Sequence, residues 1–242
     1  MTQIMKKSTA NDKAFYVKEM FTKIANKYDL LNNLMTFGLH YKWKEEAIDL
    51  ALKEINNPKS ALDLCSGTGD LAIILNGKVP KINITCVDNC SSMFDIAKVK
   101  IENLKIKNID LLLEDCEKLP FYSWSFDLIT MGFGLRNLVN KEKCLSDIFG
   151  FLKPDGVFVC LDLGYPVNFF WQKLYSLYFC NVIPKAGEFF AKNKEAYTYL
   201  PESLKTWYKQ EELKELILKT GFKKCYLKNL LGGAVAIHVA VK

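Results

Sequence analysis

The chain has 242 residues, half of them hydrophobic and a quarter charged, so it can bury one sizeable α/β core with an added cap. Its formal net charge is +6, but the lysines are spread along the chain without a dense basic run. This argues against a dedicated nucleic-acid groove and leaves a weak attraction to an anionic membrane open. The eight cysteines show no Cys-x-x-Cys spacing, and the chain has only two histidines. We therefore expect neither a zinc site nor a disulfide framework.

The N-terminal residues are not expected to form a secretory signal. Residues 1–7 contain no apolar signal core, and no segment reaches the ~20 uninterrupted apolar residues that span a bilayer. We therefore expect a cytoplasmic protein that is soluble or at most peripheral at the inner face of the membrane.

Residues 1–57 predict two helices. Apolar residues near the start recur at the spacing of one helical face, at Val17, Met20, Phe21, Ile24, Ala25 and Tyr28. This first helix should lie flat against an apolar surface. A second helix is expected around residues 40–56, where Asn56-Asn57-Pro58 ends it.

Residues 58–164 alternate between strand and helix patterns. Buried parallel strands are predicted by the apolar runs at 60–65, 82–87, 109–113, 126–132 and 156–163. Helical spacing is found at 91–105 and 141–152, and the second of these ends at the turn Lys153-Pro-Asp-Gly156. This alternation indicates a doubly wound α/β sheet that forms the cofactor-binding core.

The last third of the chain predicts a cap and the end of the sheet. Residues 165–208 are dense in aromatics and interrupt the alternation, so we interpret them as a cap or substrate-binding insertion. The run Phe169 to Phe179 fits plain core, a groove for a prenyl tail or a membrane-facing surface. Residues 209–242 then predict a final helix and two strands, at 222–228 and 234–241. The whole chain, 1–242, is expected to be a single domain with a seven-stranded, mostly parallel sheet.

A glycine turn follows the first predicted strand, within Ala61-Leu-Asp-Leu-Cys-Ser-Gly67-Thr-Gly69-Asp-Leu-Ala72. Gly67 and Gly69 let the backbone approach a ligand closely and adopt positive φ without steric cost. Asp88 comes at the end of the next strand, where its carboxylate can accept hydrogen bonds from a ribose diol. A glycine turn with a distal acid predicts a nucleoside-binding site.

The same pattern also fits the dinucleotide fingerprint of dehydrogenases. Three features favour S-adenosylmethionine instead. Asp63 precedes the first glycine by four residues, where a carboxylate meets the cofactor's ammonium directly or through water. Asp115 follows the third strand, where methyltransferases contact the adenine edge, and the chain lacks the Tyr-x-x-x-Lys pair of short-chain dehydrogenases.

One arginine stands among 33 basic side chains, at Arg136 in the phrase Met131-Gly-Phe-Gly-Leu-Arg-Asn137. Lysine supplies the other positive charges, so the single guanidinium is expected where a planar, fixed fork of donors is needed. A leftover surface arginine is the alternative.

The chain resembles, over nearly its whole length, the ubiquinone/menaquinone biosynthesis C-methyltransferases, which are class I enzymes that methylate the ring of a prenylated quinol. The segments that carry the resemblance are Met20 to Asn32 with Tyr28-Asp-Leu-Leu-Asn32, Phe37-Gly-Leu-His40 with Trp43, Leu62 to Asp70, Leu119-Pro-Phe121, Ser125-Phe-Asp127, Gly132 to Asn137, Leu152-Lys-Pro154, Tyr199 to Ser203 and Gly233 to His238. The glycine turn alone indicates only a methyltransferase. The Tyr-Asp-Leu-Leu-Asn and Phe-Gly-Leu-Arg-Asn phrases are specific to this family.

The resemblance implies a set of S-adenosylmethionine contacts. Thr68 would contact the methionine end of the cofactor, Asp88 its ribose, and Asp115 with the backbone of Cys116 its adenine. Gly132 would line the cofactor pocket. The chain departs from the family at Asp162-Leu-Gly, where Glu-Phe-Ser is more usual.

The resemblance also implies a catalytic role for Arg136. Carbon methylation needs a quinol whose hydroxyl has lost its proton, and a permanent guanidinium charge suits stabilisation of that oxyanion. Its pKa above ~12 makes arginine a poor general base, so another residue or a water would take the proton. The quinol pocket is expected to include Tyr28, Asn137 and His238.

These substrate-site residues have structural alternatives. His238 fits a satisfied structural histidine in the last strand, Tyr28 and Asp29 fit a cap of the first helix, and Asn137 fits a residue that orients the loop of Arg136.

The predicted function is C-methylation of a prenylated quinol with S-adenosylmethionine, with demethylmenaquinol as the favoured substrate because the Met-Gly-Phe-Gly-Leu-Arg-Asn loop and Leu-Asp-Leu resemble members that make menaquinone or phylloquinone. A ubiquinol or phylloquinol precursor is the alternative within the family. Two alternative functions lie outside the family: a methyltransferase that acts on another lipid, such as a sterol or fatty acyl chain, and a non-catalytic module that only binds the cofactor. Peripheral membrane contact, a homodimer and a quinone-synthesis complex are the partners compatible with this reading.

Overall fold

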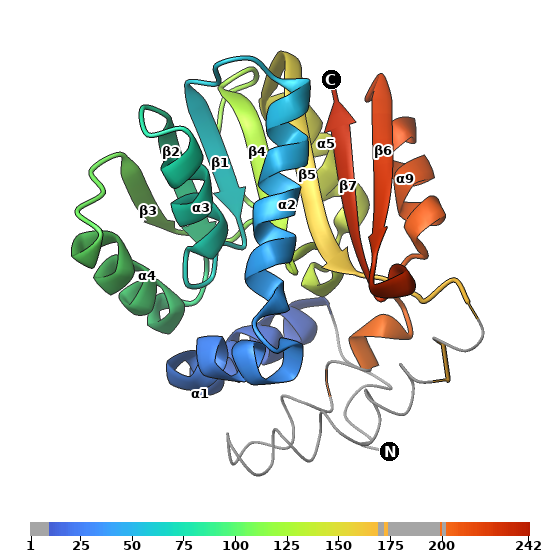
Figure 1. Ribbon diagram of the computed structural model, residues 1–242, viewed down its shortest axis with the longest axis horizontal. Coiled ribbons are helices and arrows are strands. Elements are labelled where there is room, and N and C mark those ends of the chain that lie inside the picture. Colours follow the sequence, from blue (N-terminus) through green and yellow to red (C-terminus); the bar gives the residue numbers. More distant parts are fainter. Residues whose placement is uncertain (1–9, 169–171, 174–198, 200–201) are drawn as a thin grey trace.

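The computed structural model describes residues 10–168, 172–173, 199 and 202–242 (Figure 1). The N-terminal part forms α1 (Ala10–Thr36) and α2 (Leu39–Glu54), as the apolar spacing predicts. The interpretation of Tyr28 and Asp29 as a cap of the first helix is wrong, because α1 continues past both to Thr36.

The sheet has seven strands: β1 (Ser60–Leu64), β2 (Asn83–Asp88), β3 (Ile109–Leu113), β4 (Phe126–Gly132), β5 (Leu152–Leu163), β6 (Lys224–Leu230) and β7 (Val235–Val241). Their order is β3-β2-β1-β4-β5-β7-β6. β7 pairs antiparallel with both β5 and β6, and the pairs among the first five strands are parallel. The prediction of a seven-stranded, mostly parallel sheet is therefore confirmed.

Helices cover both faces of this sheet. The helices that follow the N-terminal pair are α3 (Asp70–Lys78), α4 (Ser91–Asn103), α5 (Lys141–Phe151) and α9 (Gln210–Lys219), with short 3-10 turns η2 (Leu135–Asn137) and η5 (Leu231–Gly233). β5 begins earlier than predicted, because the expected turn at 153–156 is taken into the strand and a register shift opposite Phe126 and Leu128 accommodates it.

Two apolar cores lie on the two faces. Ala61 and Leu62 are neighbours in β1 but belong to different cores, because successive side chains of a strand point to opposite faces. One core packs β-sheet side chains against α2, α3 and α4, and the other packs them against α1, α5 and α9. Figure 1 shows α2 and α3 in front of the sheet and α1 across the end of the molecule toward which β1 and β5 point.

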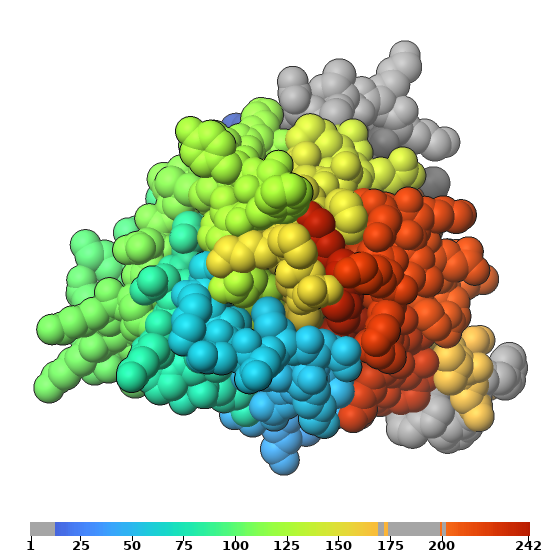
Figure 2. Space-filling view, turned by 90° about the horizontal axis from the view of Figure 1, so that it is seen from above, coloured from blue at the N-terminus to red at the C-terminus, as the bar shows by residue number. Residues whose placement is uncertain are grey.

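The opposite end of the sheet is closed by compact turns. Figure 2 looks onto this amino edge, where the end of α2 in blue and the C-terminal strands in red flank the start of β5 in yellow. The two ends of the sheet are thus covered in different ways, one by α1 and the other by short connections.

The predicted cap lies largely outside the described residues, as does most of the aromatic run from Phe169 to Phe179. Within the described part of this segment, the Tyr165 hydroxyl donates to Trp207 O at 3.1 Å and the Trp207 indole donates to Leu163 O at 2.7 Å. These bonds tie Trp207 to the end of β5. Among the described helices, none is both long and apolar enough to cross a membrane.

Gly164 lies at a point of tight packing where the chain leaves β5. A Cβ at this position would lie 2.5 Å from the carbonyl oxygen of Gly233 and 3.0 Å from the side chain of Gln210. Because a backbone oxygen cannot rotate away, we expect Gly164→Ala to lower the free energy of unfolding by about 1–3 kcal/mol in urea denaturation.

The matched control is Gly150→Ala in α5, where a Cβ would meet no described atom within 4 Å. This variant should gain about 0.5–1 kcal/mol from helix propensity. Equal stability changes in the two alanine variants would contradict the packing argument.

Candidate functional site

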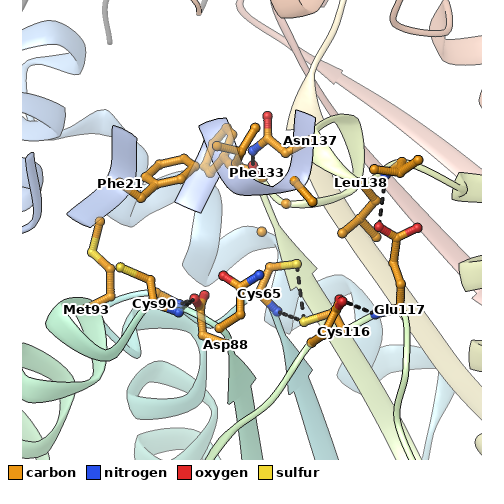
Figure 3. A pocket seen from close by; sticks show the side chains of 18 of the residues that line it. Phe21, Cys65, Asp88, Cys90, Met93, Cys116, Glu117, Phe133, Asn137 and Leu138 are labelled. Carbon is orange, nitrogen blue, oxygen red and sulfur yellow. Dashed lines mark hydrogen bonds between the residues drawn. The ribbon is translucent and has the colours of Figure 1, made fainter. Parts of the chain in front are cut away.

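A pocket lies at the carboxyl edge of the sheet, between the loops that follow β1 to β4 and the inward face of α1 (Figure 3). The space around it, with the open solvent at its mouth included, amounts to about 780 Å³. Most residues predicted for the cofactor and the substrate line it: Tyr28, Gly67, Asp88, Asp115, Cys116, Gly132 and Asn137.

The glycine turn presents open backbone to this pocket. Gly67 has φ +55, and a Cβ on it would meet no described atom within 4 Å, so a ligand can approach its backbone closely. Gly69 has φ +80 and starts α3, where a Cβ would lie 3.4 Å from the Cβ of Ala97. Both glycines therefore occupy the left-handed region that their sequence pattern predicts.

Asp88 braces two loops and still faces the pocket. Its Oδ2 accepts the N–H of Gly67 and its Oδ1 the N–H of Cys90, each at 2.9 Å. Each carboxylate oxygen keeps a further lone pair, so the group can also accept from a ligand diol. Burial raises the pKa of Asp88, and the backbone hydrogen bonds offset part of that rise.

Asp115 and Cys116 form the neighbouring wall. Asp115 Oδ1 accepts the N–H of Glu117 at 3.0 Å, and its carboxylate lies 3.4 Å from the ammonium of Lys118. The Cys116 thiol accepts the N–H of Cys65 at 3.3 Å and lies 3.6 Å from the Cys65 thiol. These contacts hold the loop after β3 against the loop after β1.

Asp63 lies in β1 beneath the glycine turn and is 1 % exposed. Its Oδ1 accepts the Thr130 hydroxyl at 2.6 Å, whereas its Oδ2 has no hydrogen-bond partner among the described residues. Burial raises the pKa of Asp63 to about 7, against the lowering effect of the hydrogen bond from Thr130. A buried oxygen without a donor suits a nearby cation or water.

Thr68 is directed into a network of charges at the start of α3. Its hydroxyl donates to Asp29 Oδ1 at 2.8 Å and accepts from the Lys100 ammonium at 3.0 Å. Lys100 also binds Asp29 Oδ2 at 2.6 Å and Asp70 Oδ1 at 2.7 Å, and Lys44 binds Asp70 Oδ2 at 2.6 Å. Thr68 lies outside the described pocket lining, and its predicted contact with a cofactor stays a prediction.

Burial and the charges of this network shift the pKa values of its members. Burial raises the pKa of Asp70, but Lys44 and Lys100 more than offset it and the net shift is downward. Burial together with the Lys44 charge lowers the pKa of His40 to about 4, so this imidazole is neutral at physiological pH. Its Nε2 and Nδ1 contact Asn33 and Lys44 at 3.1 and 3.2 Å.

Arg136 lies on η2, on the loop that leaves β4, as the sequence predicts. Its Nη1 donates to Asp162 Oδ1 at 2.6 Å and to Phe133 O at 2.5 Å, and its N–H donates to Asp162 Oδ2 at 3.2 Å. The side chain is 7 % exposed, is not among the residues that line the described pocket, and its Nε has no partner among the described residues. Burial would lower the pKa of Arg136, but Asp162 raises it further above its ordinary value.

Asn137 and Tyr28 both line the pocket, the first from η2 and the second from α1. The Asn137 amide donates to Phe133 O at 3.2 Å, and its oxygen accepts the Tyr199 hydroxyl at 3.2 Å. Tyr28 packs edge-on against Phe21, with ring centroids 6.0 Å apart, on the inward face of α1. Asn137 therefore orients the loop of Arg136 and lines the pocket at the same time.

His238 is not brought to the pocket. It lies in the middle of β7, is 2 % exposed, and its Nε2 contacts Gln210 O at 2.8 Å. Burial lowers its pKa, so the ring is neutral at physiological pH. This geometry favours the structural alternative over a contact with substrate.

Several residues at the site could not be assigned to it from the sequence. Glu117 lines the pocket and accepts the N–H groups of Val139 and Asn140 at 3.0 and 2.6 Å, so it holds the loop after η2 in place. Lys44 and Lys100 occupy ordinary helical positions in a lysine-rich chain. Phe21 belongs to a helical apolar stripe, which predicted burial but not a pocket wall.

Comparison with known proteins identifies relatives along the whole chain. A model of the ubiE/COQ5 methyltransferase family matches residues 6–242. A ubiquinone/menaquinone biosynthesis C-methyltransferase UbiE of Rickettsia bellii is 40% identical over 243 residues, covering 98% of this chain and 96% of the relative. The proteins of the same name from Blochmanniella floridana and Legionella pneumophila are 38% and 37% identical, covering 95% and 96% of this chain and 91% and 93% of theirs.

Solved structures share the fold at low identity. A putative methyltransferase of Haloferax volcanii, in complex with the Trm112 activator, has a TM-score of 0.66 at 15% identity, covering 91% of this chain and 96% of that one. An S-adenosylmethionine-dependent methyltransferase of Thermotoga maritima has a TM-score of 0.64 at 19% identity, covering 93% and 99%. These similarities establish the class I methyltransferase fold.

The raised pKa of Asp63 predicts a pH-dependent stability difference. Its folded pKa of about 7 exceeds the ordinary 3.8, so the folded state holds this proton more tightly and wild type loses stability as pH rises toward 7. Asp63→Asn removes this titration. In urea unfolding, the stability of Asp63→Asn relative to wild type should improve by about 2 kcal/mol between pH 5 and pH 7.

Asp127→Asn is the control. Burial raises the pKa of Asp127. Hydrogen bonds from Lys153 and from the backbone of Lys59 and Ser60 lower it by more than burial raises it, so the net pKa is below its ordinary value. Both states are then ionised from pH 5 to pH 7, and its stability difference from wild type should stay flat. A flat difference for Asp63→Asn as well would contradict the raised pKa.

Proposed function

The chain belongs to the ubiE/COQ5 methyltransferase family, and from this membership we propose that it methylates a ring carbon of demethylmenaquinol to give menaquinol. It is an S-adenosylmethionine-dependent C-methyltransferase of ubiquinone/menaquinone biosynthesis. The choice of a naphthoquinol ring is supported by the sequences of the Met131 to Asn137 loop and the Leu161-Asp-Leu163 segment. Both resemble the corresponding sequences of family members that make menaquinone or phylloquinone.

One observation carries the proposal. The family phrases around Tyr28 and around Arg136 are about a hundred residues apart in the chain, and both reach the pocket that holds Gly67 and Asp88. Tyr28 and Asn137 line this pocket, and Arg136 lies directly beside Asn137. A nucleoside-binding turn and the family's substrate phrases therefore share one cavity.

The residues present fit S-adenosylmethionine. The open backbone at Gly67 and the spare lone pairs of Asp88 suit its ribose, and the Asp63 oxygen that lacks a described partner suits its ammonium, directly or through water. Asp115 and the backbone of Cys116 would hold the adenine, and Gly132 leaves room beside the turn. When bound, the cofactor supplies a methyl group activated by a sulfonium.

The chain's own residues have two tasks in this reaction. They orient the quinol carbon toward the methyl group, which we assign to Tyr28 and Asn137, and they stabilise negative charge on the quinol oxygen, which we assign to Arg136. Asp162 and Phe133 hold the guanidinium behind the loop, so Arg136 also positions Phe133 to Asn137. His238, held by Gln210, is left without a part in this assignment.

The substrate also suggests partners. A prenylated quinol resides in a bilayer, so we propose peripheral contact with the inner face of the membrane, supported by the net charge of +6. The seven-residue pairing of β6 with β7 leaves the other edge of β6 at the margin of the sheet, where a homodimer or a quinone-synthesis complex could add contacts.

The test is incubation of the purified protein with labelled S-adenosylmethionine and each chemically reduced precursor. We expect label in the ring of demethylmenaquinol and much less in a ubiquinol or phylloquinol precursor. Label in a benzoquinol would move the assignment within the family. Tight cofactor binding without transfer to any quinol would contradict the proposed reaction.

Arg136→Lys separates charge from geometry, because lysine keeps the charge but loses the planar fork. We expect kcat to fall by about 10²-fold, as for loss of an oxyanion donor, while the Kd for S-adenosylmethionine changes by less than about threefold. Single-turnover assays and isothermal titration measure the two quantities.

Asp162→Asn distinguishes the two tasks of Arg136. If the guanidinium stabilises the oxyanion, this variant should lose less activity than Arg136→Lys, because the planar fork of donors remains. An equal loss would assign Arg136 to positioning of the loop alone, and wild-type turnover in Arg136→Lys would exclude both roles.

A further inference from the structure

The turn between α1 and α2 exposes a phenylalanine in an unfavourable conformation. Phe37 is 88% exposed and has φ +51, and Gly38 follows with φ +74. The N–H of Gly38 donates to Asn33 O at 3.0 Å and fixes the turn. The left-handed backbone belongs to the turn that ends α1, but the exposed ring adds nothing to the packing of the core, which points to a role outside the fold.

Phe37 continues an exposed stripe of α1. Leu30 and Leu34 are 56% and 42% exposed, and Tyr41, on the first turn of α2, is 37% exposed. Two exposed lysines precede the leucines on the same helical face, since Lys23, Lys27, Leu30 and Leu34 follow the spacing i, i+4, i+7 and i+11. The exposed Lys42 lies beside Tyr41 in α2.

The two faces of α1 look in opposite directions. Val17, Phe21 and Tyr28 point inward and line the pocket, whereas the stripe of Leu30 and Leu34 faces outward. Figure 1 shows α1 at the periphery of the molecule, at the end toward which β1 and β5 point. A surface that contacts the stripe would therefore be separated from the pocket by one helix.

We propose that this turn docks the protein on an anionic lipid bilayer, with Phe37, Leu30 and Leu34 among the acyl chains and Lys23, Lys27 and Lys42 against the phosphate headgroups. Apolar side chains flanked by lysines on one amphipathic face are the composition of interfacial helices. The proposal rests on the proposed function, because a protein that methylates a prenylated quinol must reach its substrate from the bilayer surface.

A second copy of the chain is a poorer occupant. In a two-fold contact the same patch meets itself, so the lysines of one copy would face the lysines of the other across a small apolar tip. An anionic surface removes that repulsion and complements the lysines. The bilayer is thus the occupant that fits both the apolar tip and its charges.

The test is flotation with vesicles of phosphatidylglycerol and phosphatidylcholine. Phe37→Asn removes the ring and tolerates positive φ, so the turn should be kept. Trp124→Asn is the matched control, because Trp124 is also exposed, at 63%, and left-handed, at φ +61, but lies before β4 at the amino edge of the sheet. We expect the vesicle partition coefficient to fall at least about tenfold for Phe37→Asn and to match wild type for Trp124→Asn.

Three further readouts make the outcomes decisive. Vesicles of phosphatidylcholine alone should bind wild type much more weakly, and Phe37→Asn should keep wild-type turnover on a short-tailed quinol in detergent-free solution but lose turnover on a long-tailed quinol in vesicles. Flotation of Phe37→Asn at the wild-type level, or of neither protein, would overturn the docking surface. Loss of a wild-type dimer in Phe37→Asn without any vesicle binding would overturn it in favour of self-association. Vesicle binding through Phe37 with no turnover on any quinol would instead retain the surface and refute the proposed function.

Discussion

The ammonium of Lys100 is the contact on which the shape of the pocket depends. It joins a carboxylate of α1, a carboxylate of α3 and the hydroxyl of the glycine turn, so one side chain of α4 connects three separate parts of the chain. Charges in such a partly buried place are tolerated only when they are paired. A displacement of α1 would remove Asp29 from Lys100 and Thr68 together, and this cost holds the helix over the carboxyl edge of the sheet.

Acidic side chains brace the loops around the cavity in the same manner. Asp88 accepts backbone N–H groups from the turn after β1 and the start of α4, Glu117 accepts two from the loop after η2, and Asp162 accepts the N–H and the guanidinium of Arg136. Each carboxylate satisfies donors that a loop would otherwise leave to water. The walls of the cavity are therefore tied to one another by hydrogen bonds, which favours accurate orientation of two reactants.

Sequence patterns predicted the features that depend on local order along the chain. Alternating apolar runs located the strands, and the glycines of the turn occupy the positive φ that their positions require. The direction of Thr68 was not predictable, because Asp29 and Lys100, which bind its hydroxyl, lie far away in sequence on two helices. The surroundings of His238 were not predictable for a similar reason: its strand could be recognised, but the carbonyl of Gln210 that binds its ring comes from α9.

The position of α1 also sets an order of events during synthesis of the chain. This helix is made before the strands, yet its side chains close a cavity whose other walls come much later, and the Lys13 ammonium reaches the carbonyl of Leu138 across 125 residues. Its inward apolar face therefore has no native partner while the early strands leave the ribosome. Contacts of such long sequence separation form slowly, so the cavity is completed only after β4 and η2 have been made and folded.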